Sequence, residues 1–302
     1  MANGSSHMQK ITTNLWFDTQ AKEAAEFYTS TFSDSKIINS SIIHGSPSGD
    51  VDILTVELMG REFTLISAGP LFKLNPSISF LVGCRTKEEV DELWQSLSAG
   101  GTALMELGSY PFSERYGWIQ DRYGVSWQIM FMGDREILQS IIPTLMFVGD
   151  VSGKAEGAVN FYASVFNDAK VGDIMRYEKG DEPEEEGTIK HARVVLEGQE
   201  FAAMDSARMH DFAFNEAISL VVSCDSQAEV DHHWDLLSAV SESEQCGWLK
   251  DKYGVSWQIV PNALDRMMAD EDQEKVARVT EAFLKMKKLD IAELEAAYAN
   301  DK

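Results

Sequence analysis

Three polar side chains in the second half of the chain have the spacing of a binding-site wall. His191 and Arg193 lie two residues apart in Lys190–Leu196, where polar and apolar residues alternate. Such alternation is typical of a β-strand, so the two side chains share one face. Asp205 ends the next expected strand. The pattern fits the polar wall of a pocket and a solvent-facing strand edge equally well.

Groups for nucleophilic or acid–base catalysis are less evident. Glu57 could act as a general base if it faced a cavity, but a charged residue on an outer face is the simpler interpretation. The sequence shows no Ser–His–Asp or Cys–His arrangement and no nucleophile elbow. The acidic run at 181–186 is interpreted as a solvated hairpin loop.

The elements that must position these residues occur twice. Gly117–Ile129 and Gly247–Ile259 are identical at ten of thirteen positions, with a constant offset of 130. Other segments match in the same order at offsets up to 140, which indicates loops of different length between equivalent elements. A repeat this long indicates a duplicated domain. The predicted divisions are a tag remnant at 1–9, domains at 10–132 and 133–261, and C-terminal helices at 262–302.

Each copy is predicted to contain two βαβββ units, which makes the fold class α+β. In copy one, strand-like alternation at 11–17 precedes helical spacing at about 20–32 and three further strand-like segments. A second unit opens at Ile78, and the capping box Thr86–Glu89 begins its helix. Copy two repeats this pattern. The C-terminal segment is predicted to form two helices that pack on the domains or on a dimer partner.

Cysteine and histidine usage follows the repeat. Cys84 and Cys224 are equivalent positions and are interpreted as small buried apolar residues. His233 takes the apolar helix position that Leu93 holds in copy one, so a core histidine is expected there rather than a metal ligand.

The composition excludes several classes of function. A net charge of −23 opposes binding to nucleic acid or to anionic lipids. There is no run of 18 apolar residues that could span a membrane. The first residues resemble an expression tag and have no apolar segment of a secretion signal. We therefore expect a cytoplasmic protein without nucleic-acid or membrane partners.

Two segments of each copy carry a family resemblance. The Ala-Glu-Phe-Tyr helix after Leu15–Phe17 and the closing segment Asp121–Ile129 resemble the vicinal oxygen chelate superfamily of glyoxalases and bleomycin-resistance proteins. Tyr-Gly-Val-Ser-Trp-Gln is similar to the PhnB-like branch, often labelled 3-demethylubiquinone-9 3-methyltransferase-like. The resemblance implies two tandem domains, each with two units in a curved mixed sheet around a small-molecule cavity. The label implies S-adenosylmethionine, but the sequence has no Gly-rich strand-to-helix loop of the kind that binds it.

The resemblance also implies where a divalent metal would be held. The positions fall at Asn14 and Thr144 on the first strands, Ser77 and Ala217 at the head of the fifth, and Gln128 and Gln258 on the last. None is His, Asp or Glu, the residues that ligate Fe, Mn, Ni or Zn in such sites. We therefore predict neither a metal nor a cofactor.

The resulting hypothesis is a PhnB-like protein that binds an unidentified small molecule without the usual metal. In copy one, Asn14, Trp16, Ser126 and Gln128 are expected to share the cavity face. The predicted substrate-binding residues are Asn14, Trp16, Glu57, Gln128, Thr144, His191, Arg193, Asp205 and Gln258. A metal-dependent lyase or dioxygenase and the methyltransferase of the label stay open as alternatives. The copies are expected to pair within one chain as a pseudo-dimer, and a further homodimer is left open.

Overall fold

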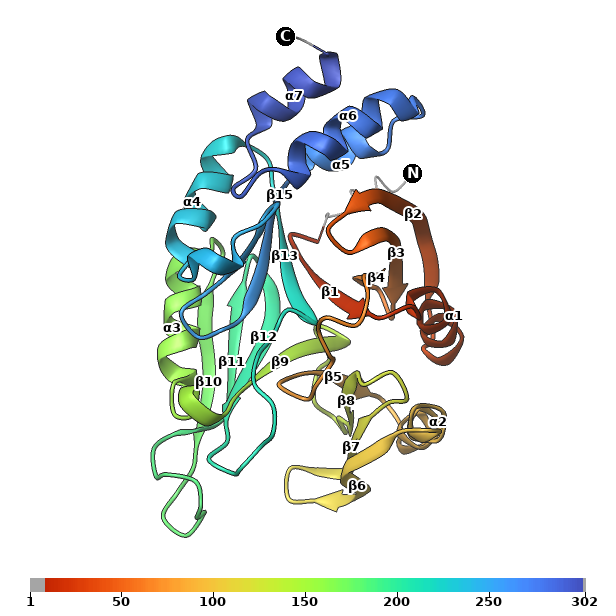
Figure 1. Cartoon of the computed structure of the whole chain (residues 1–302). Helices are drawn as coiled ribbons and strands as arrows, with labels where there is room; N and C mark the ends of the chain where they lie inside the picture. The colour runs from red at the N-terminus through yellow and green to blue at the C-terminus, as the bar shows by residue number, and fades with distance from the viewer. Residues whose placement is uncertain (1–8, 301–302) are drawn as a thin grey trace, which may run out of the picture.

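The computed structural model describes residues 9–300, which form two mixed β-sheets with helices packed against them (Figure 1). This architecture confirms the α+β fold class. The predicted tag remnant lies outside the described residues except for Gln9. No helix in residues 9–300 has the length and apolar composition to cross a membrane.

Copy one contains two complete βαβββ units. The first consists of β1 (Ile11–Phe17), α1 (Ala21–Thr31), β2 (Lys36–Ser46), β3 (Gly49–Leu58) and β4 (Arg61–Ser67). The second consists of β5 (Ile78–Cys84), α2 (Lys87–Ser98), β6 (Thr102–Tyr110), β7 (Ser113–Gln120) and β8 (Ser126–Phe131). The predicted capping box begins α2, since the Thr86 hydroxyl accepts a hydrogen bond from the Glu89 amide.

Copy two repeats the first unit but not the whole of the second. Its first unit has β9 (Ile141–Phe147), η1 (Gly149–Val151), α3 (Ala155–Val165), β10 (Lys170–Arg176), β11 (Ile189–Leu196) and β12 (Gln199–Asp205). Its second has β13 (Ile218–Cys224), α4 (Gln227–Leu237), η2 (Ser241–Ser243), β14 (Trp248–Lys250) and β15 (Ser256–Pro261). The C-terminal extension has α5 (Asn262–Met268), α6 (Gln273–Leu284) and α7 (Ile291–Ala299), one helix more than predicted.

Each sheet combines strands of both copies. Sheet A has the order β14-β15-β13-β1-β4-β3-β2, and sheet B has the order β10-β11-β12-β9-β5-β8-β7-β6. Antiparallel pairs β1–β13 and β5–β9 join the first unit of one copy to the second unit of the other. The expectation that both units of a copy share one sheet is corrected here. The exchange pairs the first strands of the units with one another, so those strands are not left as exposed edges.

The two copies are related by an approximate two-fold arrangement. In Figure 1, α1 and α2 of copy one lie on the right and α3 and α4 of copy two on the left. Matching hydrogen bonds cross between the copies: the Asn75 amide donates to the carbonyl of Ala213, and the Asn215 amide donates to the carbonyl of Lys73, both at 2.9 Å. The chain is therefore a pseudo-dimer of its own two halves.

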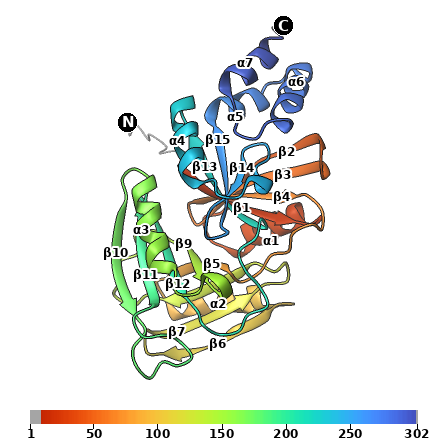
Figure 2. The same cartoon turned by 60° about the vertical axis from the view of Figure 1, so that its left-hand side comes forward.

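Copy two lacks the counterpart of strand β6. The offset between the copies falls from 140 at Trp94 and Trp234 to 130 at Trp118 and Trp248, so ten residues are missing there. The expectation that only loops differ in length is wrong at this point. The backbone of the C-terminal extension takes over the pairing, because the amides of Cys246 and Gly247 donate to the carbonyls of residues 286 and 287. Helix α5 contacts β15 and α6 contacts β2, so the three helices gather at one end of sheet A (Figure 2).

The repeated signature segment is part of the scaffold. The Asp121 carboxylate accepts hydrogen bonds from the Tyr28 hydroxyl at 2.6 Å, the Trp127 indole at 2.9 Å and the amides of Tyr123 and Val125 at 2.9 and 3.0 Å. Burial raises the pKa of Asp121, and the four donors oppose that shift. In copy two the same four bonds reach Asp251 from Tyr162, Trp257, Tyr253 and Val255. The conserved spacing of the two copies thus joins a helix to the turn before the last strand.

Candidate functional site

Each sheet has one face that packs on helices and a second, inner face. On β13, Leu220 and Val222 are fully buried beneath the helices, whereas Val221 and Ser223 on the other face are half-buried. The strand register carries this alternation across both sheets, because residues paired across neighbouring strands project to the same side. We call these inner faces face A, on sheet A, and face B, on sheet B.

The exchange of units regroups the predicted site residues. Asn14, Trp16, Glu57 and Gln258 lie on face A, while Gln128, Thr144, His191 and Arg193 lie on face B. The expectation that Asn14 and Trp16 share a cavity with Ser126 and Gln128 is therefore wrong. Each face takes its first-strand residue from one copy and its last-strand residue from the other.

The centre of face A is a group of amides and hydroxyls. Asn14 on β1 pairs in register with Ser219 on β13 and with Thr64 on β4. The Gln258 amide donates to the Ser219 hydroxyl at 3.0 Å. Asn14 is 2% exposed, and its Nδ2 atom has no hydrogen-bond partner among the described residues. Such an unpaired buried donor is uncommon, because desolvation without a new bond is unfavourable.

Aromatic side chains flank these amides. Trp16 shares the face of Asn14 and contacts Phe72 and Trp248 edge-on, with ring centroids 5.0 and 6.0 Å apart. The Trp16 indole donates to the carbonyl of Gly69 at 2.8 Å, which fixes its orientation. Phe72 comes from the loop between β4 and β5 and Trp248 from the edge strand β14. Both rings are half-buried, so part of the aromatic surface is accessible.

Carboxylates occupy another part of face A. Glu57 and Glu62 are paired in register on β3 and β4, and both are half-buried. Desolvation and the neighbouring Glu57 charge raise the pKa of Glu62. Asp265 on α5 is exposed, yet partial desolvation and the Glu62 charge also raise its pKa, to about 6. Glu57 thus belongs to a group of three carboxylates, and this group disfavours a negatively charged ligand.

Face B, in contrast, satisfies its own polar groups. Gln128 accepts a hydrogen bond from the Tyr116 hydroxyl at 2.6 Å and donates one to the Ser79 hydroxyl at 2.8 Å. The Thr144 hydroxyl donates to the carbonyl of Ile142 at 3.3 Å. A separate apolar cluster fills the face: Leu81, Tyr116, Trp118, Met130, Ile142, Met146, Val148 and Ala202. Little of this surface is left for a ligand.

His191 and Arg193 do share the inner side of β11, as their spacing predicted. The Arg193 guanidinium lies 3.4 Å from the Glu200 carboxylate on β12. Desolvation and the Arg193 charge lower the pKa of His191 to about 4, so the imidazole is neutral. Arg193 and Glu200 also line a small cavity of about 60 Å³ beneath residues 136–139. That volume holds about two water molecules, at roughly 30 Å³ each.

Asp205 lies on neither inner face. It pairs in register with Phe147, whose ring packs in the helix-side core. Its carboxylate accepts hydrogen bonds from the amides of Gly153, Ala155 and Ile189 at 2.8 to 3.1 Å. The equivalent residue of copy one, Ser67, likewise accepts from the amide of Ala21 at the start of α1. The polar wall predicted from His191, Arg193 and Asp205 is corrected accordingly: Asp205 holds the start of α3.

On both inner faces, the positions that the resemblance implies lack the donor set of a metal centre. The positions implied by the resemblance hold one Asn, one Thr, one Ser, one Ala and two Gln residues. The side-chain oxygen and nitrogen of Gln128 each already form a hydrogen bond. Amide and hydroxyl oxygens without a carboxylate or imidazole hold a transition metal weakly. The residues do not fit such a centre.

Comparison with known proteins gives the relationship. Residues 9–130 and 139–260 each match the protein family described as 3-demethylubiquinone-9 3-methyltransferase. The chain belongs to this family. A member of known structure, a putative 3-demethylubiquinone-9 3-methyltransferase (PhnB protein) from Bacillus cereus, is 41% identical over 41% of this chain and 99% of its own, with a TM-score of 0.38. No curated protein matches the sequence.

The wider fold is that of glyoxalase I. Glyoxalase I from Zea mays is 11% identical and superimposes with a TM-score of 0.54 over 87% of this chain and 98% of its own. This likeness confirms the vicinal oxygen chelate fold for the family member described here. It says nothing of activity, because identity is low and fold alone does not fix function.

Sequence reasoning missed several residues of face A. Ser219, Thr64, Phe72, Glu62 and Asp265 were not singled out, although Ser219 follows directly from the repeat as the counterpart of Ser79. Phe72 has Phe212 as its counterpart at the same loop position, and Phe212 packs on face B. The matching positions of Phe72 and Phe212 in the two copies could have indicated that this loop contributes an aromatic ring to each inner face.

Proposed function

We propose that this protein binds, on face A, a small aromatic molecule that carries a hydrogen-bond acceptor and no negative charge, without a metal. The observation that carries the proposal is the Asn14 amide, whose Nδ2 atom is buried and unpaired among the described residues. Leaving a buried donor unpaired costs about 1–3 kcal/mol. A ligand carbonyl or ether oxygen at this point would recover that energy.

The surroundings of Asn14 support this ligand chemistry. Trp16, Phe72 and Trp248 offer ring edges and faces to an aromatic group. Gln258 is half-buried beside them and can accept a further hydrogen bond through its side-chain carbonyl. An apolar surface with a few fixed polar groups is typical of a small-molecule site.

The charge on face A argues against an anionic ligand. Glu57 and Glu62 contribute two carboxylates, and Asp265 of α5 adds a third nearby. Desolvation is the larger cause of the raised pKa values of Glu62 and Asp265, and the charge of the neighbouring carboxylate adds to it. Face B is the weaker candidate, since Gln128 is fully bonded and the methionines and aromatic rings fill its centre. We favour binding over a metal-dependent activity of the glyoxalase type, because the family's metal positions on face A, Asn14 and Gln258, supply no carboxylate or imidazole.

Tryptophan fluorescence tests this proposal. The full chain is titrated with a panel of neutral aromatic ketones and phenols, because ligand on face A would change emission from Trp16 and Trp248. For a compound that binds, Asn14→Leu should raise the Kd about tenfold. Loss of one hydrogen bond costs about 1.4 kcal/mol of binding free energy, which corresponds to that factor. Thr144→Val, at the equivalent first-strand position of face B, is the matched control and should bind as the unchanged protein does. The proposal is wrong if no compound binds, or if binding depends on Thr144 and not on Asn14.

A further inference from the structure

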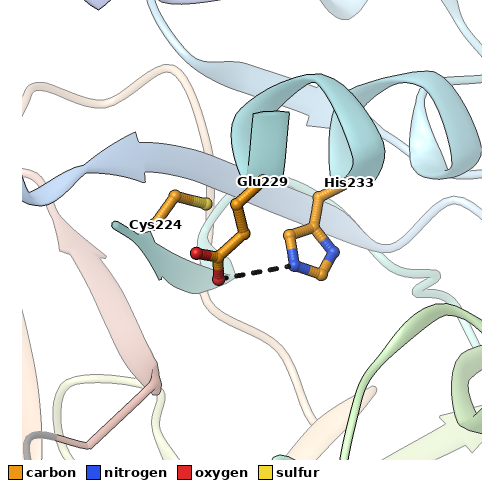
Figure 3. Close-up of side chains that lie close together, drawn as sticks. All are labelled: Cys224, Glu229 and His233. Carbon is orange, nitrogen blue, oxygen red and sulfur yellow. Dashed lines mark ion pairs between the residues drawn. The ribbon is translucent and has the colours of Figure 1, made fainter. Parts of the chain in front are cut away.

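We propose that Cys224, Glu229 and His233 form a site for a soft divalent metal such as Zn²⁺, on the helix side of sheet A and separate from both inner faces. Cys224 ends β13, and Glu229 and His233 lie one turn apart on α4 (Figure 3). One ligand atom from each lies within 4.8 Å of the other two. Thiolate, imidazole and carboxylate are the ligands that zinc takes in proteins.

His233 places one ring nitrogen toward Glu229. Its side chain is 2% exposed, and its Nδ1 atom has no hydrogen-bond partner in residues 9–300. The Nε2 atom points toward Glu229 at 4.0 Å from Oε1, which is too far for a hydrogen bond (Figure 3). The ring stacks on Phe166, with centroids 5.0 Å apart, so its orientation is fixed. A metal at Nε2 would use the ring nitrogen that faces Glu229, while Nδ1 would stay without a partner among the described residues.

Lys10 places the positive charge of its ammonium group beside Glu229, one of the three proposed ligands. Its ammonium group forms an ion pair with the Glu229 carboxylate, and its positive charge also acts on Cys224 and His233. The Lys10 side chain is 22% exposed, so it can turn toward solvent without leaving a buried charge behind. A bound metal would replace this charge beside Glu229. Cys224 would bind as the thiolate, and its proton would pass to solvent.

The equivalent place in sheet B provides a natural comparison. The residues equivalent to Cys224, Glu229 and His233 are Cys84, Glu89 and Leu93, and the residue equivalent to Lys10 is Ser140. Sheet B therefore keeps the thiol and the carboxylate but has neither the imidazole nor the competing ammonium. His233 and Lys10 occur together at the site beside sheet A. A metal there would need His233 as a ligand, and the Lys10 ammonium would take the place of the metal when none is bound.

The site adjoins the C-terminal extension. Gln227 on α4 donates to the carbonyl of Leu289, and its side-chain carbonyl accepts from the amide of Ile291 at the start of α7. Asn262 of α5 bonds the carboxylate of Asp225. A metal that fastens α4 to β13 would thus also stabilise the attachment of α5 and α7.

Cobalt titration of the metal-free full chain tests the site. Cobalt bound to Cys224 should give a near-ultraviolet sulfur-to-metal charge-transfer band that added Zn²⁺ removes. His233→Leu, which installs the residue of copy one, should weaken Co²⁺ binding at least tenfold, and Cys224→Ser should abolish the band. Cys84→Ser is the matched control and should leave both unchanged. Lys10→Met should strengthen binding, because it removes the competing charge.

Several outcomes would overturn the site. They are the absence of a band in the unchanged protein, equal binding by His233→Leu, loss of the band in Cys84→Ser, and weaker binding in Lys10→Met. Circular dichroism of each variant establishes that it is folded. If Cys224→Ser does not fold, His233→Leu decides the question alone, since Leu93 shows that this scaffold accommodates leucine at the position.

Discussion

Faces A and B are built from equivalent strands, yet one is closed by its own side chains and the other is not. On face B, Tyr116, Gln128 and Ser79 bond one another, and the aromatic rings of Tyr110 and Phe112 pack on Tyr116. These rings come from the β6–β7 hairpin. Face A lacks the equivalent of β6, and its central amide has no partner among the described residues. The loss of one strand thus coincides with the appearance of polar groups that a ligand could satisfy.

The two glutamines on the last strands should respond very differently to substitution. Gln128→Leu leaves the Tyr116 and Ser79 hydroxyls buried without their partner and should lower the free energy of unfolding by about 3 kcal/mol. Gln258→Leu removes a single bond, from a half-buried side chain to the buried Ser219 hydroxyl, and should cost about 1 kcal/mol. Urea unfolding followed by fluorescence measures both. Equal losses would show that face B is no more closed than face A.

Asn14 should show the opposite sign. Asn14→Leu replaces an unpaired buried amide with an apolar side chain of similar size, so we expect a gain of about 1 kcal/mol in unfolding free energy. Thr144→Val on face B removes a bonded hydroxyl and should give no gain. The same urea experiment compares the two variants. A loss of stability in Asn14→Leu would mean that the amide is already satisfied.

Asp265 should give the smallest effect, visible as a pH dependence, because the residue is exposed and solvent screens its charge. Its pKa is raised from 3.8 to about 6 in the folded protein, so the folded state binds more protons than the unfolded state between these values. Its contribution to stability is therefore present below about pH 4 and is lost as the pH rises to about 6. Asp265→Asn should raise the melting temperature at pH 7 relative to the unchanged protein but not at pH 4. Arg266→Gln, at the neighbouring position of α5, is the control, because removing a nearby positive charge should act in the opposite direction.

The units of the fold could be read from the sequence because their signals are local. Helical spacing, the Thr86 capping box and the repeated Asp121–Ile129 segment each report on neighbouring residues. His191 and Arg193 share a face for the same reason, since alternation within one strand decides it. The family resemblance added the fold that these elements build.

The partners of the units were not readable, because strand pairing between copies depends on contacts far apart in the chain. Asn14 pairs in register with Ser219, more than 200 residues away, and nothing in the local pattern of β1 selects β13 over β5. Asp205 was misplaced for a related reason. Alternation placed it on a strand, but its three amide donors come from separate segments that only the folded chain brings together.

The exchange of units also affects how this protein can change over generations. Face A draws on the first unit of copy one and the second unit of copy two, and face B draws on the other two. Selection on one face therefore acts on half of each copy and leaves the other half free to diverge. The parts that must evolve together are one unit of copy one and the unit of copy two that shares its sheet. A recombination event that exchanged one whole copy would therefore alter both faces at once.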